Sequence, residues 1–279
     1  MAKREMGKLL GGALGLAAFG GLIAAPQPAA ALTINANFTN FGSNADEQNV
    51  FEAAIQWWEM IITTPFTFNV TVNRFDFIND GNPNNNGTLG QTSGFTEDGT
   101  TKLPTGATVD MGICSDWFID PTPHEESEFT QISTDPPVFT ANAGGPAANK
   151  FDFLSVAKHE LGHALGFTVN YTKFAAQVGA ESGGKRAFGG GIATLGPASA
   201  GTHLDAGTHP DDLMVATIGA GKRRLQSNLD CAVLTKAFGY ECSTALHKIP
   251  EPSTVFLLAI ALLGLAGLHA APRLRRAAG

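Results

Sequence analysis

Residues 151–167, FDFLSVAKHELGHALGF, carry the pattern that decides the fold and the chemistry of this 279-residue chain. Their apolar residues recur at roughly helical spacing, which predicts an amphipathic helix. His159 and His163 are four residues apart, so they share one face of that helix, and Glu160 projects beside them. Neutral imidazoles suit zinc, and an adjacent carboxylate can take a proton from a metal-bound water. The stretch therefore predicts a zinc site with Glu160 as general base.

Two histidines do not complete a catalytic zinc site, which usually takes three protein ligands. Residues 159–166, HELGHALG, resemble the H-E-x-x-H-x-x-G-x-x-H motif of the metzincin metalloproteases. Gly166 matches the family's glycine, which lets the chain leave the helix in a left-handed conformation. The family's third histidine would fall at Val169, so the chain departs from the pattern there. Members that resemble leishmanolysin take this ligand from a later segment, just before a methionine-containing turn.

Residues 201–214 offer such a segment. His203 precedes Met214 by eleven residues, so the resemblance implies that His203 is the third ligand and that Met214 packs its thioether beneath the metal. Core filling is a physically similar role for this methionine. Two rivals for the third ligand stay open: His209, which could instead stabilise the turn, and Glu181, whose neighbouring glycines disfavour a helix. The remaining histidines are expected to be surface or structural residues: His124, His247 and His269.

The amino-terminal end predicts export. Residues 1–31 begin with basic residues, continue with an apolar run over 9–25 and end in small residues, as a secretory signal peptide does. Cleavage is expected before Leu32. A transmembrane anchor is the alternative, and the short run that ends in prolines and an A-x-A site argues against it.

The carboxyl-terminal residues 250–279 form a tail in three parts: a Pro-rich spacer, a mostly apolar run over 255–271, and a group of arginines. This tail resembles the PEP-CTERM sorting signal of Gram-negative bacteria. The resemblance implies an exosortase-type sorting enzyme as a partner, cleavage of the tail, and a destination outside the inner membrane, secreted or at the cell surface or matrix. The alternative is a permanent carboxyl-terminal membrane anchor, because the apolar run is marginally long enough to span.

Between the two signals lie 218 residues, 32–249, enough for one domain with a sizeable core. This region holds 12 Lys and Arg against 23 Asp and Glu, a formal charge of about −11. Such acidity argues against a nucleic acid as partner, since nucleic-acid binding calls for a basic patch. The excess of acid otherwise indicates solubility and repulsion from anionic surfaces.

The hydrophobic patterns predict an α+β fold. A helix is expected over 45–62, and strands over 65–77, 107–113 and 117–119. The metzincin resemblance implies a twisted mixed sheet with the active-site helix in an upper lobe, about 32–166. It also implies the methionine turn and a last helix in a lower lobe, about 167–249, and an antiparallel edge strand above the zinc, which would suit an extended peptide substrate.

Two segments rich in turn residues have open roles. Residues 79–87, NDGNPNNNG, are expected to form a loop whose Asp80 and asparagine oxygens could hold calcium, although solvated turn residues are the commoner explanation. The Gly- and Ala-rich residues 188–201 are either a flexible insertion that delivers His203 or loops that line the cleft.

Three cysteines make an odd count for an oxidising destination. Cys231 and Cys242 can close a short loop, since Ser227 and Asp230 form a capping pair that opens a helix between them. Cys114 would then be free or paired with another molecule. Other connectivities stay open, because sequence alone does not decide them.

These patterns together predict a secreted zinc-dependent endopeptidase. The competing class is a cell-surface or matrix protein that keeps zinc for structure alone. Glu160 argues against that class, because a structural site needs no base and usually has four protein ligands.

Overall fold

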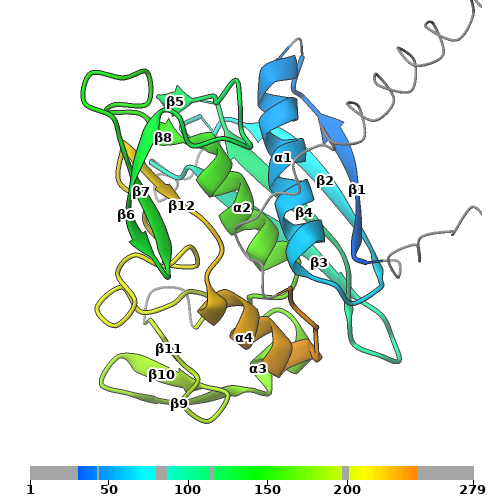
Figure 1. Ribbon diagram of the computed structural model, residues 1–279. Coiled ribbons are helices and arrows are strands. Elements are labelled where there is room, and N and C mark those ends of the chain that lie inside the picture. Colours follow the sequence, from blue (N-terminus) through cyan, green and yellow to red (C-terminus); the bar gives the residue numbers. More distant parts are fainter. Residues whose placement is uncertain (1–30, 43, 80–86, 114–115, 197–200, 244–279) are drawn as a thin grey trace, which may run out of the picture.

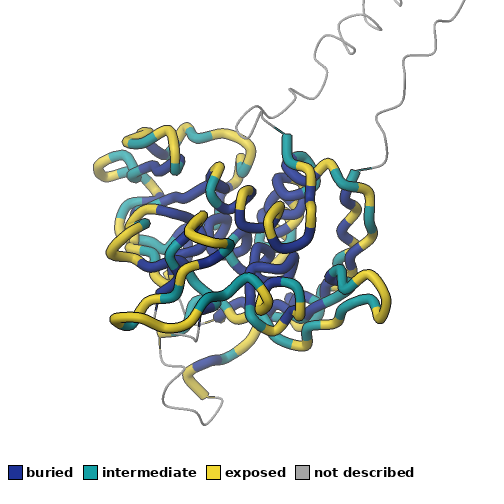
Figure 2. The backbone as a smooth tube through the Cα atoms, turned by 90° about the horizontal axis from the view of Figure 1, so that it is seen from below, coloured by how far each residue is buried: buried dark blue, intermediate teal, exposed yellow. Residues whose placement is uncertain are grey.

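The computed structural model of the protein describes residues 31–42, 44–79, 87–113, 116–196 and 201–243. Helices and strands are mixed in this part of the chain, and strands predominate (Figure 1). The α+β class is confirmed at this level. Buried segments run through the middle of the molecule, with exposed loops around them (Figure 2).

The largest sheet has four strands in the order β1-β2-β4-β3. Strands β1 (Thr33–Thr39), β2 (Thr67–Phe75) and β4 (Pro104–Gly112) are parallel, and β3 (Gly90–Glu97) is the antiparallel strand at the edge. Buried and exposed residues alternate along β2 because successive side chains point to opposite faces of a sheet. The strands predicted over 65–77 and 107–113 are therefore present, with bounds shifted by a few residues.

Two helices lie side by side across the apolar face of this sheet (Figure 1). They are α1 (Ala45–Ile61) and α2 (Phe153–Ala164). The indole nitrogen of Trp58 in α1 donates a hydrogen bond of 2.9 Å to the carbonyl of Lys158 in α2, and both residues are buried. The predicted helix 45–62 ends one residue early, because Ile62 has an extended backbone and bridges to the carboxyl-terminal part of the domain.

Short strands close the amino-terminal end of α2. Strand β12 (Lys222–Arg224) pairs with β7 (Pro137–Ala141), which pairs with β6 (Phe129–Thr134). Strand β5 (Trp117–Phe118) pairs with β8 (Phe151–Asp152), directly before α2, and confirms the strand predicted at 117–119. A late part of the sequence is thereby brought against the start of α2.

The segment after α2 is more ordered than the sequence suggested. It contains the short helix α3 (Thr172–Ala175) and a three-stranded sheet of β9 (Val178–Ser182), β10 (Lys185–Phe188) and β11 (Ala193–Leu195). Glycines with positive φ make its turns, so the composition that suggested a structureless insertion instead forms tight reversals. The expectation of a flexible insertion is wrong for these residues.

Helix α4 (Asn228–Phe238) begins and ends as its sequence predicts. The Ser227 hydroxyl accepts from the Asp230 amide at 3.1 Å, and the Asp230 carboxylate accepts from the Ser227 amide at 2.9 Å. The helix ends at Gly239, whose φ of 74° is left-handed. The predicted capping pair is therefore confirmed.

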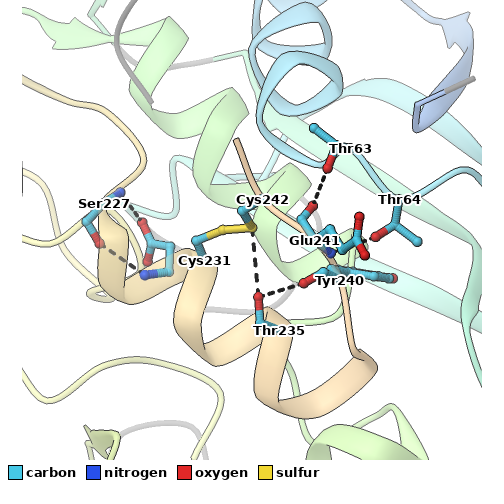
Figure 3. The surroundings of a disulfide bond; sticks show 9 residues. Thr63, Thr64, Ser227, Cys231, Thr235, Tyr240, Glu241 and Cys242 are labelled. Carbon is cyan, nitrogen blue, oxygen red and sulfur yellow. Dashed lines mark hydrogen bonds between the residues drawn. A yellow bond between two sulfur atoms is a disulfide. The ribbon is translucent and has the colours of Figure 1, made fainter. Parts of the chain in front are cut away.

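A disulfide joins Cys231 in α4 to Cys242, with 6.4 Å between their Cα atoms (Figure 3). Cys242 also forms an antiparallel bridge with Ile62 at the end of α1, so the disulfide ties α4 to the first helix. The Thr235 hydroxyl donates to the carbonyl of Tyr240 within the closed loop, at 2.7 Å. The pairing of these two cysteines is confirmed.

Several expectations concern residues outside the described ranges. They are the signal peptide apart from Ala31, the calcium site at Asp80, the state of Cys114, and the tail over 250–279. Within the described residues, no helix combines the length and apolar character that a membrane span requires.

Candidate metal centre

Helix α2 carries three of the predicted site residues, and its first turn is firmly capped. The Asp152 carboxylate accepts hydrogen bonds from the Ser155 amide at 3.1 Å and from the Ser155 hydroxyl at 2.6 Å. This satisfies an amide that would otherwise lack a partner at the helix start. The cap and the buried apolar face fix the helix, so that His159, Glu160 and His163 are presented from a rigid element.

The chain turns sharply just after α2. Gly166 has a φ of 136°, a conformation that other residues rarely adopt, and a Cβ added there would collide with the ring of Phe238. The turn brings the Phe167 carbonyl to 2.7 Å from Nδ1 of His163. Val169, at the position of the metzincin histidine, packs against the hydrophobic core.

His203 reaches the helix from a distant segment that two bridges hold in place. Its neighbour Leu204 bridges to Leu195 on one side and to Val215 on the other. The His203 carbonyl accepts from the amide of Gly196 at 3.0 Å. The backbone therefore supports this histidine on both sides.

The Nε2 atoms of three histidines converge on one point. They are separated by 3.0 Å between His159 and His163, 3.0 Å between His163 and His203, and 3.2 Å between His159 and His203. Two tetrahedral ligands that each lie about 2.1 Å from one zinc are about 3.4 Å apart. The triangle of nitrogens is thus close to the size that a single zinc ion requires.

The second ring nitrogen of each histidine has its own partner. Nδ1 of His159 donates to the Leu213 carbonyl and Nδ1 of His163 to the Phe167 carbonyl, both at 2.7 Å, while Nδ1 of His203 lies 3.2 Å from the Thr202 hydroxyl. A proton on Nδ1 leaves a lone pair on Nε2, which is the arrangement of metal-binding histidines. The carbonyl partners fix this arrangement for His159 and His163, and Nε2 of His203 lies within 3.2 Å of both.

Burial keeps these imidazoles neutral. It lowers the pKa of His159 to about 4 and, with His159 beside it, that of His203 to about 3. Burial and the two neighbouring histidines place the pKa of His163 well below its usual range. Neutral imidazole is the form that binds a metal, so the fit of donor chemistry, orientation and spacing to zinc is good.

Glu160 is buried where α2 meets the edge strand β3. The Thr92 hydroxyl lies 2.7 Å from Oε2 of Glu160 and 2.9 Å from its backbone oxygen. A Cβ added at Gly90 would lie 2.8 Å from Cγ of Glu160, so glycine makes room for this carboxylate. Burial raises the Glu160 pKa to about 7, against the hydrogen bond from Thr92, which lowers it. A carboxylate with a pKa near neutrality is poised to accept and return a proton.

Met214 is fully buried and lies against α2 between the two motif histidines. A Cβ added at Gly162 would be 2.5 Å from the Met214 sulfur and 3.3 Å from the Trp58 ring. Because Gly162 has no side chain, the Met214 thioether can pack directly against the backbone of α2. The preceding residue, Leu213, provides the carbonyl that holds His159.

A cleft of about 460 Å³ opens beside His159, Glu160 and His203. Residues 87–90, which lead into β3, form one wall, and residues 215–218 contribute another. Strand β3 is the edge strand of the four-stranded sheet, and its first residue, Gly90, lines the cleft. Of the described residues between 168 and 202, none lines this cleft, so the expectation of cleft-lining loops over 188–201 does not hold for those described.

The two rivals of His203 lie elsewhere. His209 accepts from the Thr194 amide through Nε2 at 3.4 Å and supports the loop before Met214. Glu181 is exposed on β9 and pairs with Arg186. In the described part of the chain, the three converging histidines form the one group of donor side chains whose ligand atoms all lie within 4.8 Å.

Some residues of the site gave no signal in the sequence. Thr92 and Gly90 lie some 70 residues before Glu160, in a strand with ordinary composition. Asp152 could have been recognised as a cap, because an Asp directly before an apolar run of helical spacing is a helix-start signal. The pair Arg223-Arg224 stands out in an acidic domain, yet the sequence does not show where it lies.

Comparison with known proteins identifies the end of the chain. Residues 248–271 match the PEP-CTERM protein-sorting motif. The match overlaps the predicted tail, so the chain carries the signal of exported or surface proteins of Gram-negative bacteria, which an exosortase-type enzyme recognises. No curated protein matches the chain.

Proposed function

We propose that the protein is an exported zinc-dependent endopeptidase with His159, His163 and His203 as the zinc ligands and Glu160 as general base. The observation that carries the proposal is the convergence of three histidine Nε2 atoms beside a buried carboxylate in the wall of a cleft. Zinc, when bound, supplies Lewis acidity that polarises a carbonyl and makes water easier to deprotonate.

Glu160 is positioned for proton transfer. Thr92 holds Oε2, which leaves Oε1 to accept a proton from the attacking water. The same group can then deliver that proton to the leaving amine, since a pKa near neutrality permits both steps. Neither tyrosine assists: the hydroxyls of Tyr171 and Tyr240 donate to helix carbonyls within the core.

The edge strand β3 supports a peptide as the substrate. An extended peptide can add to a free sheet edge through main-chain hydrogen bonds, and such bonds do not depend on its sequence. Strand β3 is antiparallel and lies at the edge of the sheet, with Gly90 at the cleft and Thr92 on the general base. This arrangement would align a peptide bond beside Glu160.

A structural zinc site in a surface protein is the second candidate, because it would need the same three histidines. A purely structural site is usually closed by a fourth protein ligand. Among the described residues no fourth donor joins the group, and His159 and His203 line the open cleft. These observations favour catalysis.

The test separates the two candidates. In the Glu160→Gln variant, zinc content should stay at about one per chain while turnover falls by roughly 10²–10⁴, the usual contribution of a general base. Glu125→Gln, at an exposed glutamate, serves as the matched control and should leave turnover unchanged. A zinc-loaded wild type that cleaves neither an unfolded protein nor a peptide library would favour the structural site.

We further infer that the sorting tail is removed after export. Its Pro-rich spacer lies between the domain and the apolar run, so a cut near Pro250–Pro252 would release the domain from the membrane. Mass spectrometry of the exported protein should give a carboxyl terminus close to this point. Extracellular protein that retains the terminal arginines would contradict the inference.

A further inference from the structure

Arg224 lies at the end of the cleft away from the general base. It lines the cleft together with Ser155, Val156 and Thr217, although the residue is only 9 % exposed. Its backbone amide lies 2.8 Å from the Ser155 hydroxyl, which anchors it to the first turn of α2. Residues 155 and 160 of a helix are about 7.5 Å apart along its axis, roughly the reach of one long side chain.

The Arg224 guanidinium has no carboxylate partner among the described residues. Nη1 donates to the carbonyls of Asp212 and Thr217 at 3.2 and 2.8 Å, and Nη2 to that of Pro210 at 3.0 Å. Nε is buried without any hydrogen-bond partner. The adjacent Arg223, in contrast, contacts three carboxylates. Carbonyl dipoles compensate a buried cation less fully than a carboxylate does.

The other described residues of the cleft do not supply an anion close to Arg224. Among the described lining residues Glu160 is the one acidic residue, and the Thr92 hydroxyl holds it at the opposite end. Burial lowers the pKa of Arg224, and the charges of Asp211 and Asp212 partly offset this. Neither forms an ion pair with Arg224: the Asp212 carboxylate accepts from the Ser227 hydroxyl, and Asp211 is exposed to solvent. The other lining residues between the two ends are neutral, for example Val156. A ligand that enters this end of the cleft therefore meets a cation.

We propose that the cleft selects peptides with an acidic side chain, Asp or Glu, on a residue next to the scissile bond, whose carboxylate binds the Arg224 guanidinium. This proposal rests on the endopeptidase function and names its substrate class. The domain as a whole is acidic, so general attraction would not favour such peptides. The preference must come from Arg224 at short range, and it should weaken as salt is added.

The first experiment compares substrates on the zinc-loaded protein. Peptide pairs that differ as Glu against Gln are scanned over the positions on either side of the cleaved bond. At one position kcat/KM should be roughly ten- to hundredfold higher for Glu, the range expected for a charge-assisted hydrogen bond. Equal rates at every position, or a preference for an apolar residue throughout, would overturn the proposal.

The second experiment assigns the preference to Arg224. Arg224→Gln should abolish the discrimination between Glu and Gln, while Lys222→Gln, two residues away on the same strand, should preserve it. A folded Arg224→Gln protein that still prefers Glu would overturn the assignment. Because Arg224 also donates hydrogen bonds to three carbonyls, its replacement can affect folding, and circular dichroism checks that the variant is folded. If the variant does not fold, the binding experiment below tests the selectivity instead.

The third experiment has a readout besides turnover. The Glu160→Gln protein should bind a labelled Glu peptide roughly ten- to hundredfold more tightly than its Gln counterpart, measured by fluorescence anisotropy. Selective binding without cleavage by the wild type would refute the endopeptidase function and leave the acidic selectivity standing. Equal binding, or no binding of either peptide, would overturn the selectivity.

Discussion

Helix α2 has a buried polar cluster at each end, and the two follow opposite rules. At its amino-terminal end Arg223 is fully buried and contacts Asp120, Asp152 and Glu126 at 2.6, 2.8 and 2.9 Å. At the other end three neutral imidazoles direct their lone pairs at one another. Opposite charges hold the first cluster together, whereas the second consists of neutral imidazoles.

The difference separates structure from function. Breaking a buried ion pair leaves an uncompensated charge, so a closed cluster of this kind holds strands and helix together. Three buried imidazoles whose Nε2 atoms lie within 3.2 Å of one another gain little from opposite charge, and they have the arrangement of metal ligands. The arginine cluster is thus expected to matter for folding, and the histidine cluster for zinc.

The largest effect should follow from removing a histidine. His203→Ala leaves two protein ligands, so zinc affinity should fall by far more than the roughly 10- to 100-fold that is typical of changes outside the ligands. Elemental analysis and titration with a zinc indicator would measure it. Hydrolysis should disappear together with the metal.

His209→Ala is the matched comparison, because His209 lies in the same loop without joining the cluster. Zinc should be retained at about one per chain, and the same should hold for the exposed His124→Ala. A protein that keeps zinc without His203 and loses it without His209 would reverse the assignment of the third ligand.

Breaking the arginine cluster should destabilise the domain without changing its chemistry. Arg223→Met leaves three carboxylates without their cation and should cost about 3–5 kcal/mol in the free energy of unfolding. Urea unfolding would measure the loss. At a low temperature, at which the Arg223→Met variant remains folded, its zinc content per chain should be close to that of the wild type. Loss of zinc affinity from a fully folded variant would show that the two clusters are not separate in role.

The metal-free protein should respond to pH through its buried site. The Glu160 pKa is about 7 in the folded protein against 4.5 in the unfolded chain. Because the buried carboxyl group is harder to ionise, the free energy of unfolding should fall as pH rises from about 4.5 through 7. Glu160→Gln should therefore stabilise the metal-free protein at pH 8, by about 3 kcal/mol at most, and have little effect at pH 4. Urea unfolding after chelation, at both pH values, measures this.

The histidines act in the opposite direction. The pKa values of His159 and His203 are lowered to about 4 and about 3 in the fold, so metal-free stability should fall as pH drops below about 6.5. Acid should also release zinc, because protons compete for the ligands. The Glu160→Gln background removes the opposing effect of the carboxylate, and a metal-free stability of that variant that does not change between pH 8 and pH 5 would contradict these environments.

The smallest effect concerns the packing beneath the histidines. Gly162→Ala adds a methyl group 2.5 Å from the Met214 sulfur, which must move. Overpacking of this kind costs about 1–3 kcal/mol. The double variant Gly162→Ala with Met214→Ala should recover part of that loss, if the contact is its cause. Thermal unfolding of the metal-free proteins compares them.

Several elements followed from local patterns. The helix that carries the motif, the capping box of α4 and the turn at Gly239 all depend on neighbours in the sequence, where propensity and capping act. The segment between α2 and His203 does not follow from its composition. A glycine-rich stretch can be a flexible insertion or a set of tight turns between paired strands, and here it forms the turns of a small sheet. Only the pairing of the strands distinguishes the two structures.

The sequence by itself determined the helix that carries the H-E-x-x-H residues and the sorting motif, because each depends on residues close together in the chain. It favoured the pairing of Cys231 with Cys242, which the structure then decided. The tertiary structure alone decided which histidine of the later loop meets the helix. It also decided that Thr92 holds Glu160 and that Arg224 lies in the cleft without a carboxylate partner among the described residues. These contacts join residues that are about 40 to 70 positions apart, and sheet register and packing bring them together after the chain has folded.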